Sequence, residues 1–324
     1  MTLVQLRYLA AIVDAGLNIT AAARQVHATQ PGLSKQIKQM EGELGFQLFH
    51  RRGKSLEGLT AAGGEVLTSA RLILSETANI HALAASHRQD VSGELRIATT
   101  HTQARFVLPP AITRIRRRFP DIRLHLAPSG EGEALERLDQ DAADLAILSG
   151  GEQLPTGHLA VPIYRWDLVG LRRPGPPFPG AERSVSLRAL AGVPLVTYES
   201  ALEPASSFAR AFSDAGLDFQ LACTARDSDL IKTYVRAGLG LGVLAEMAVT
   251  SDDADLERLD LHTLFPTRTT WVVLRRDRVL RGHLIELLGE LAPHLERRDL
   301  LRAFDGAAPA WPEAPRWRDL PQAA

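Results

Sequence analysis

AAARQVHATQPGLSKQIKQMEGELGFQLF, residues 21–49, contains two helical patterns separated by a break at Ala28-Thr29. In the first pattern, from Ala21 to His27, alanines leave room for close packing against another helix, and Thr20 can cap the start. The second pattern opens at Gln30, and Pro31 suits a first helical turn. Its apolar face has helical spacing and consists of Leu33, Ile37, Met40 and Leu44. The stretch therefore predicts two helices joined by a tight turn.

The flanking sequence completes a small domain. One face of an earlier helix, which ends at Gly16, carries the apolar residues Leu3, Leu6, Leu9, Ala10 and Val13. After Gly45, FHRRGKSL at 49–56 predicts a tight basic hairpin. Residues 1–60 contain seven Lys and Arg against four Asp and Glu, which gives +3, whereas the whole chain carries −1. The basic excess therefore coincides with the two-helix motif.

This combination predicts a winged helix-turn-helix that binds double-stranded DNA. The start of the second motif helix would enter the major groove, where polar groups meet base edges and basic groups meet phosphates. The hairpin would contact the backbone or the minor groove. The predicted contacts are Thr29, Gln30, Pro31, Ser34, Lys35 and Lys38 on the helix, with Arg51 and Arg52 on the hairpin. The alternative for any one of these charges is an ordinary solvated side chain.

A long helix is expected next, because no proline occurs from Thr60 to about Arg88. Apolar residues recur every seven positions and small residues follow four positions after each: Val66, Ile73 and Ile80, then Ala70, Thr77 and Ala84. This spacing is typical of a two-stranded coiled coil, and a dimer would present two recognition helices to an inverted repeat. The alternative is a helix that packs on its own domain.

Strand and helix patterns alternate in the remaining two-thirds of the chain. We expect strands at 93–98, 122–126, 144–148, 195–198, 241–244 and 271–275, and helices at 104–118, 131–140, 206–215, 227–237 and 280–291. The alternation predicts parallel α/β sheets in two units, with the last strand returning to the first unit. Residues 307–324 are rich in proline and alanine and are expected to lie outside the core.

Composition excludes several classes of protein. Cys223 is the only cysteine, so neither an intramolecular disulfide nor a cysteine-rich metal site is possible. No stretch approaches the roughly 20 apolar residues that a membrane span needs, and no secretory signal is recognisable at the N-terminus. We therefore expect a cytoplasmic protein without contact to a membrane.

A polar turn, TTHTQ at 99–103, follows the first strand of this region. Ligands of open α/β sheets bind at the carboxyl ends of strands, and hydroxyl and amide groups can hold an oxyanion without formal charge. The alternative is a helix start whose threonines satisfy its own backbone. His101 could act as a catalytic base, but no nucleophile motif, metal-ligand spacing or phosphate loop accompanies it, so no enzyme, metal or cofactor is predicted.

These motifs resemble those of LysR-type transcriptional regulators over essentially the first 300 residues. TQPGLSKQ at 29–36 is similar to the family at large. ATTHTQAR at 98–105, DLIKTYVR at 229–236 and APHL at 292–295 are similar to its CysB/Cbl group, which controls sulfur assimilation.

The resemblance implies an α+β multidomain protein that is a tetramer built from dimers. A winged helix-turn-helix (1–60) and a linker helix (61–90) would precede a two-lobed effector-binding domain (91–298) resembling type 2 periplasmic binding proteins. Lobe 1 would span about 91–164 and 267–298, lobe 2 about 165–266, and a tail would follow at 299–324. The ligand between the lobes would be acetylserine, sulfate, thiosulfate or adenosine phosphosulfate.

Carried over position by position, the resemblance places Thr100, Thr102 and Gln103 at the anionic part of the ligand. Ser149 keeps a hydroxyl where the group has threonine, and Trp166 matches a position implicated in the response to inducer. Glu203 departs from the pattern, because it lies near a threonine position of the group. A carboxylate would repel sulfate and tolerate an amine, unless Glu203 points outward and Ser206 or Ser207 lines the cleft instead.

The sequence thus predicts a DNA-binding transcriptional regulator that responds to a small anionic or zwitterionic sulfur compound. Promoter DNA, other copies of this chain and RNA polymerase are its expected partners. One alternative is a LysR-type regulator of another pathway with a small carboxylate ligand. Another is a solute-binding protein, which the basic N-terminal motif opposes.

Overall fold

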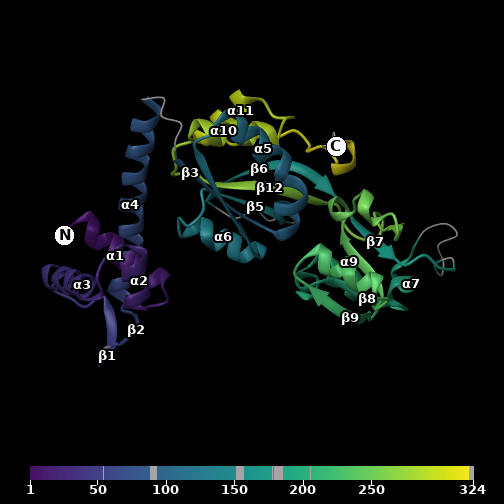
Figure 1. The fold of residues 1–324 in the computed structure, drawn as a ribbon, viewed down its shortest axis with the longest axis horizontal. Helices are drawn as coiled ribbons and strands as arrows, with labels where there is room; N and C mark the ends of the chain where they lie inside the picture. The colour runs from purple at the N-terminus through teal and green to yellow at the C-terminus, as the bar shows by residue number, and fades with distance from the viewer. Residues whose placement is uncertain are drawn as a thin grey trace. The chain divides into compact units, whose positions relative to one another are not determined.

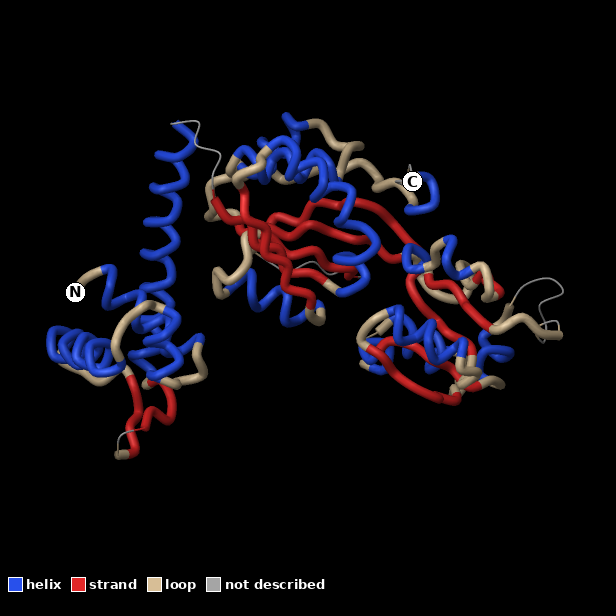
Figure 2. The backbone as a smooth tube through the Cα atoms, viewed as in Figure 1, coloured by secondary structure: helices blue, strands red, loops and turns tan. Residues whose placement is uncertain are grey.

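The computed structural model describes residues 1–53, 55–87, 93–150, 157–176, 178, 185–204 and 206–320. The chain forms two compact units, Met1–Asp90 and Val91–Ala324 (Figures 1 and 2). The hairpin residue Lys54 and residues 88–92, which include the end of the expected linker helix, lie outside the described ranges.

The first unit is a winged helix-turn-helix followed by a long helix, as predicted. Its elements are α1 (Leu3–Asp14), α2 (Ile19–Gln25), α3 (Gln30–Leu44), β1 (Phe49–Arg52), β2 (Ser55–Leu59) and α4 (Ala61–His87). Strands β1 and β2 pair antiparallel and form the wing. The fully buried core consists of apolar side chains from all three short helices and the wing, among them Leu9, Ala22, Leu33, Met40 and Phe49.

Local capping explains where the two motif helices start. Thr29 precedes α3, and its hydroxyl accepts the backbone N–H of Gly32 at 3.3 Å. The predicted cap at Thr20 is wrong, because Asn18 accepts the N–H of Ala21 at 3.0 Å and α2 already begins at Ile19. The helix therefore begins two residues earlier than expected, and Thr20 lies inside its first turn.

Helix α4 combines the two alternatives considered for it. Near its start, Leu67 and Ala70 are buried in the core of the first unit, and Arg71 pairs with Asp14 of α1 at 2.7 Å. Farther along, the seam residues Ile73 and Ile80 are 39% and 65% exposed. The early part of the helix thus packs on its own domain, whereas the later part leaves apolar side chains uncovered.

The second unit contains two five-stranded sheets, which define two lobes. In lobe 1 the strand order is β4-β3-β5-β12-β6, from β3 (Gly93–Thr99), β4 (Ile122–Pro128), β5 (Leu145–Gly150), β6 (His158–Trp166) and β12 (Arg268–Arg275). In lobe 2 it is β11-β7-β10-β8-β9, from β7 (Leu168–Arg172), β8 (Pro194–Tyr198), β9 (Gln220–Ala225), β10 (Leu241–Ala245) and β11 (Glu257–Asp260).

The sheets are mixed, so the expectation of parallel sheets was wrong in part. Strands β3, β4 and β5 are parallel, but β12 runs antiparallel to both β5 and β6. In lobe 2, β7 runs antiparallel to β10 and β11. The chain passes between the lobes directly from β6 to β7 and returns between β11 and β12, without a crossover helix that would keep the strands parallel.

Helices cover the sheets of both lobes. Their bounds are α5 (Leu108–Arg118), α6 (Glu131–Asp139), α7 (Leu187–Ala191), α8 (Ser207–Asp214), α9 (Ser228–Arg236), α10 (Gly282–Leu291) and α11 (Arg297–Phe304). In lobe 1, α5 and α10 lie on one side of the sheet and α6 on the other (Figure 1). The single helix expected from residue 104 is divided, because a π-helical turn, Gln103–Val107, precedes α5.

The C-terminal segment does not lie outside the core, contrary to expectation. Trp311 donates its indole N–H to the carbonyl of Ala160 at 2.8 Å, and the carbonyl of Pro315 accepts the N–H of Arg165 at 2.8 Å. Trp317 packs against Tyr164 with ring centroids 5.0 Å apart. Proline and alanine suggested a loose tail, but the two tryptophans supply apolar area that the edge strand β6 can cover.

Candidate DNA interface and ligand cleft

The start of α3 is open to a macromolecular partner. Most of the predicted contacts there are exposed and Ser34 is half-buried, whereas Leu33 and Ile37 on the opposite face are 0% and 2% exposed. Packing of the apolar face on α1 and α2 thus leaves the polar face free, as a recognition helix requires.

The two wing arginines differ in their surroundings. The Arg52 side chain is 87% exposed, and its closest ion pair, with Glu57, spans 3.8 Å. Arg51 donates to the buried Glu41 of α3 at 2.9 Å, and Glu41 also accepts the N–H of Leu48 at 3.0 Å. Arg52 is therefore free to contact a phosphate, whereas Arg51 holds the wing to α3.

A cavity of about 520 Å³ lies between the two lobes. All six side chains predicted from the sequence line it: Thr100, Thr102, Gln103, Ser149, Trp166 and Glu203. The lobe 1 residues come from strand ends and from the turn after β3, whereas Glu203 follows β8 in lobe 2. Glu203 is among the residues that line the cavity, and it is also exposed to solvent. Ser206 instead caps α8, accepting the N–H of Ala209 at 3.0 Å.

A buried polar network forms the lobe 1 wall. Gln103, which is 1% exposed, donates its amide N–H to Ser149 Oγ at 3.1 Å, and its carbonyl accepts the hydroxyl of Tyr164. Thr270 Oγ1 lies 2.9 Å from Ser149 Oγ and accepts the indole N–H of Trp166 at 3.0 Å. Burial raises the pKa of Tyr164, so its hydroxyl remains a donor. The Gln103 amide is thus used within the wall, where it orients the Ser149 hydroxyl.

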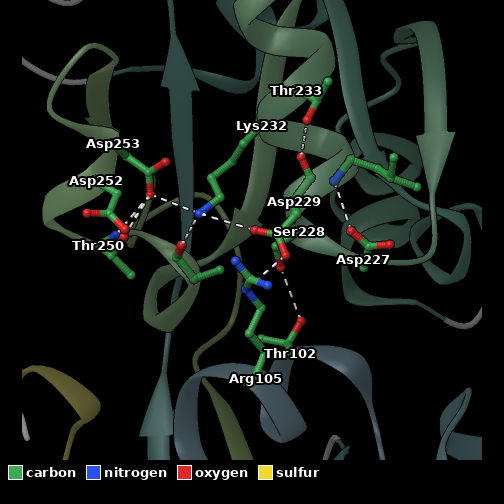
Figure 3. Close-up of polar contacts among 12 residues, drawn as sticks. Thr102, Arg105, Asp227, Ser228, Asp229, Lys232, Thr233, Thr250, Asp252 and Asp253 are labelled. Atoms are coloured by element: carbon green, nitrogen blue, oxygen red, sulfur yellow. Dashed lines mark hydrogen bonds and ion pairs between the residues drawn. The ribbon is translucent and has the colours of Figure 1, made fainter.

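Direct contacts join the lobes beside the cavity (Figure 3). Thr102 Oγ1 lies 3.2 Å from Ser228 Oγ, at the start of α9, and Arg105 pairs with Asp229 at 2.9 Å. Ser228 Oγ also lies 2.8 Å from the hydroxyl of Tyr198 in lobe 2. In this structure Thr102 therefore links the turn after β3 to lobe 2.

The same region contains a buried ion pair that the sequence analysis did not identify. Lys232 Nζ lies 2.9 Å from Asp253 Oδ2 and donates to the carbonyl of Ala248 at 2.9 Å (Figure 3). The two charged residues are 5% and 4% exposed. This pair fixes α9 to the segment after β10 and does not line the cavity.

Several charged residues of the cavity were also missed, and two of them, Arg268 and Glu131, contact its polar wall. Arg268, at the start of β12, donates to Ser207 Oγ at 2.8 Å and lies over the Trp166 ring, 5.4 Å from its centroid. Glu131, at the start of α6, accepts the N–H of Ser149 at 3.0 Å. Only the packing of β12 between β5 and β6, and of α6 beside β5, brings these residues together with the polar turn.

Their environment shifts the pKa of each group. Burial lowers the pKa of the Arg268 guanidinium, and the charge of Glu131 opposes this shift. Burial raises the pKa of Glu131; the Ser149 N–H and the charge of Arg268 oppose this shift, and the charge of Glu203 adds a smaller increase. The wall thus holds a cation and two carboxylates that interact electrostatically.

Over the part of the chain that the structure describes, no group of three or more His, Cys, Asp or Glu side chains could hold a metal ion. No helix within the described ranges has both the length and the apolar character needed to cross a membrane.

Comparisons with known proteins agree with this organisation. Residues 3–64 match the family model of the bacterial regulatory helix-turn-helix protein, lysR family, and residues 88–296 match that of the LysR substrate binding domain. The chain is 36% identical over 297 residues to the HTH-type transcriptional regulator CysB of Haemophilus influenzae, covering 92% of each chain. It is 35% identical over 303 residues to the HTH-type transcriptional regulator cbl of Escherichia coli, covering 93% of this chain and 96% of the relative.

A solved structure extends the likeness to three dimensions. The cofactor-binding domain of the Cbl transcriptional regulator superposes with a TM-score of 0.62 at 34% identity, covering 67% of this chain and 96% of that domain. The likeness thus covers the lobed unit and the cleft within it.

Proposed function

The chain belongs to the LysR family of DNA-binding transcriptional regulators, and from this premise we propose that it controls sulfur-metabolism genes in response to a small sulfur compound bound between its lobes. The observation that carries this proposal is the full-length similarity to CysB and cbl regulators, combined with a polar interlobe cavity. Family members are transcriptional regulators, not enzymes, and the chain is accordingly not an enzyme.

The cavity would hold the effector mainly through hydroxyl groups. Thr100 and Ser149 would bind its acidic part, while Gln103 and Thr270 orient the Ser149 hydroxyl through the network described above. Thr102 would act at the junction of the lobes, where a change in lobe closure alters its contact with Ser228. Acetylserine, sulfate, thiosulfate and adenosine phosphosulfate are the candidate effectors. A small carboxylate from another pathway is the second candidate class.

The exposed start of α3 and the wing would bind promoter DNA in the cytoplasm. Thr29, Gln30, Pro31, Ser34, Lys35 and Lys38 would face the major groove, and Arg52 would contact a phosphate. Arg51 would act indirectly by positioning the wing through Glu41. Two chains would form a dimer by pairing the exposed ends of their α4 helices, and two dimers would form a tetramer. RNA polymerase would be the protein partner at the promoter.

A thermal-shift screen of the full chain tests the effector class. A ligand that binds only the folded state raises Tm with ln(1 + [L]/Kd). We expect a shift with one of the four sulfur compounds, an affinity loss of about tenfold in Thr100→Ala, and no loss in Thr113→Ala, a threonine on the exposed side of α5. A shift only with aromatic carboxylates would assign the protein to another pathway, and absence of any gel shift with genomic promoter DNA would contradict the regulatory role itself.

A further inference from the structure

The cavity carries more charge than hydroxyl recognition of an anion requires. Six ionisable carboxylate and guanidinium side chains line it: Glu131, Glu133, Glu199, Glu203, Arg226 and Arg268. Counted as formal charges, four carboxylates and two guanidinium groups leave an excess of two negative charges. A cavity built for an inorganic oxyanion alone would be expected to carry the opposite sign.

Some of these charges are already satisfied within the protein. Arg226 pairs with Glu199 at 3.0 Å, and Glu133 pairs with Arg137, one turn along α6, at 2.8 Å. Among the residues that the structure describes, no side chain of opposite charge lies within 4.0 Å of Glu131, Glu203 or Arg268. One guanidinium and two carboxylates of the cavity thus remain available to a ligand.

Arg268 is held where an acidic group could reach it. Its guanidinium is fixed by Ser207 and by the face of Trp166, and it shares the cavity with the hydroxyls of Thr100 and Ser149. Because it is partly withdrawn from water, its attraction for an anion is stronger than that of an exposed arginine. Charge-assisted hydrogen bonds from guanidinium suit carboxylate, sulfonate and sulfate equally.

The two carboxylates provide the opposite chemistry. Glu131 is anchored through the Ser149 N–H on one oxygen, and its other oxygen accepts no hydrogen bond from the described residues. Glu203 enters the same cavity from lobe 2 and lies close enough to disfavour ionisation of Glu131. A cation between them would relieve this repulsion, whereas a second anion would add to it.

We propose that the effector is a small zwitterion, whose acidic group binds at Arg268 and whose protonated amine binds between Glu131 and Glu203. This inference rests on the proposed function and specifies its ligand class. Since Glu131 belongs to lobe 1 and Glu203 to lobe 2, the amine would also draw the lobes together. An anion without an amine would occupy only the Arg268 side of the cavity.

Two pairs of compounds test the proposal on the full chain by calorimetry. Taurine and isethionate differ by an ammonium in place of a hydroxyl, and O-acetyl-L-serine and N-acetyl-L-serine are isomers that differ in whether the amine is free. We expect at least one amine-bearing compound to bind about tenfold or more tightly than its partner, as a charge-assisted hydrogen bond predicts. Equal or tighter binding of both amine-free partners, or binding of sulfate alone, would overturn the proposal and leave the regulatory function standing.

Substitutions of the two carboxylates test whether they recognise the amine. Glu131→Gln keeps an oxygen that can accept the Ser149 N–H, and Glu203→Gln alters an exposed side chain, so each removes charge with little change of shape. Each substitution should lower the affinity for the amine-bearing compound about tenfold. The affinity for its amine-free partner should stay unchanged or rise. Glu133→Gln is the matched control, because this cavity carboxylate is already paired with Arg137.

The outcomes separate this inference from the function on which it rests. Equal weakening of both members of a pair in Glu131→Gln and Glu203→Gln would indicate a structural role and refute recognition of the amine. Absence of binding by all four compounds, sulfate, thiosulfate and adenosine phosphosulfate would refute both the zwitterion and the sulfur effector. Gel shifts with promoter DNA, measured on the same preparations, show independently whether the DNA-binding function remains.

Discussion

Arg51 and Arg52 show how two adjacent, chemically identical residues acquire different roles. Arg52→Ala should weaken DNA binding across sequences, because one phosphate contact is lost. The slope of log K against log salt concentration should become smaller in magnitude by about one. Its free energy of unfolding should change by no more than about 0.5 kcal/mol, since the side chain is 87% exposed. Gel shifts at several salt concentrations and urea unfolding measure the two quantities.

Arg51→Ala should behave differently and serves as the comparison. It leaves the buried Glu41 carboxylate with the Leu48 N–H but without its cation, at a cost of about 1–3 kcal/mol of unfolding free energy. Similar stability losses in the two variants would contradict the assignment of Arg51 to wing positioning and Arg52 to phosphate contact.

The raised pKa of Glu131 makes a separate prediction about stability. A carboxyl group whose pKa is higher in the folded than in the unfolded state binds more protons when folded, so its contribution to stability is lost as pH rises through the folded pKa. Ligand-free Glu131→Gln should therefore have a higher Tm than the parent at pH 7, and the difference should shrink at pH 4. Thermal unfolding at both pH values measures this, and a variant less stable than the parent at pH 7 would contradict it.

Part of the cleft could be predicted from single residues and part could not. The hydroxyl and amide groups of the turn after β3 stand at a strand end, where their chemistry is itself a signal. Glu131 resembles an ordinary acidic residue in the first turn of a helix, and Arg268 resembles a polar start to an alternating strand. Their charges meet only because β5 and β12 are neighbours, and strand order is not encoded in local sequence.

At the scale of elements, the long periodic helices were predicted, whereas the strands β6, β7, β9 and β11 were missed. Helix α3 and helix α4 have clear periodicity, and both occur close to the expected residues. Strands β6 and β7 were not predicted, because they are buried along most of their length and show no alternation, and because the β6 sequence contains a proline, Pro162. The antiparallel β12 could not be distinguished from a parallel strand by its composition.

The exposed end of α4 carries the prediction for dimerisation. Ile73 and Ile80 lie on the heptad seam and are uncovered, so burial against a second α4 would remove apolar area from water. Ile80→Asp should shift the protein from dimer or tetramer toward smaller species and weaken binding to an inverted repeat by tenfold or more. Sedimentation velocity and gel shifts measure these effects.

Leu72→Asp is the matched control for this seam. Leu72 is 55% exposed on the same helix but lies outside the heptad positions. If both substitutions dissociate the protein equally, α4 associates through a different face, and if neither does, α4 does not supply the dimer contact.

At the scale of the whole chain, the C-terminal segment ties together the crossing between the lobes. Asp167 lies between β6 and β7 and is 3% exposed. Its carboxylate pairs with Arg318 at 2.8 Å and with Arg316 at 3.2 Å, both in the C-terminal segment. It also accepts the hydroxyl of Thr267, in the returning crossover, at 2.7 Å. One buried carboxylate thus joins both crossovers to the end of the chain.

Removal of these two cations is expected to destabilise the second unit. Arg316→Ala with Arg318→Ala leaves the buried Asp167 carboxylate with the Thr267 hydroxyl, without these two cations and beside the buried Glu246 carboxylate, which should lower the free energy of unfolding by roughly 2–4 kcal/mol. If the loss comes from an uncompensated buried charge, adding Asp167→Asn should recover a measurable part of it. Arg298→Ala, on the exposed side of α11, should change stability by no more than about 0.5 kcal/mol. Urea unfolding of the four proteins decides the matter. A double variant as stable as the parent would mean that the two arginines contribute nothing to stability and that the other contacts of the C-terminal segment hold it on lobe 1. No recovery with Asp167→Asn would mean that the arginines act through packing and not through charge.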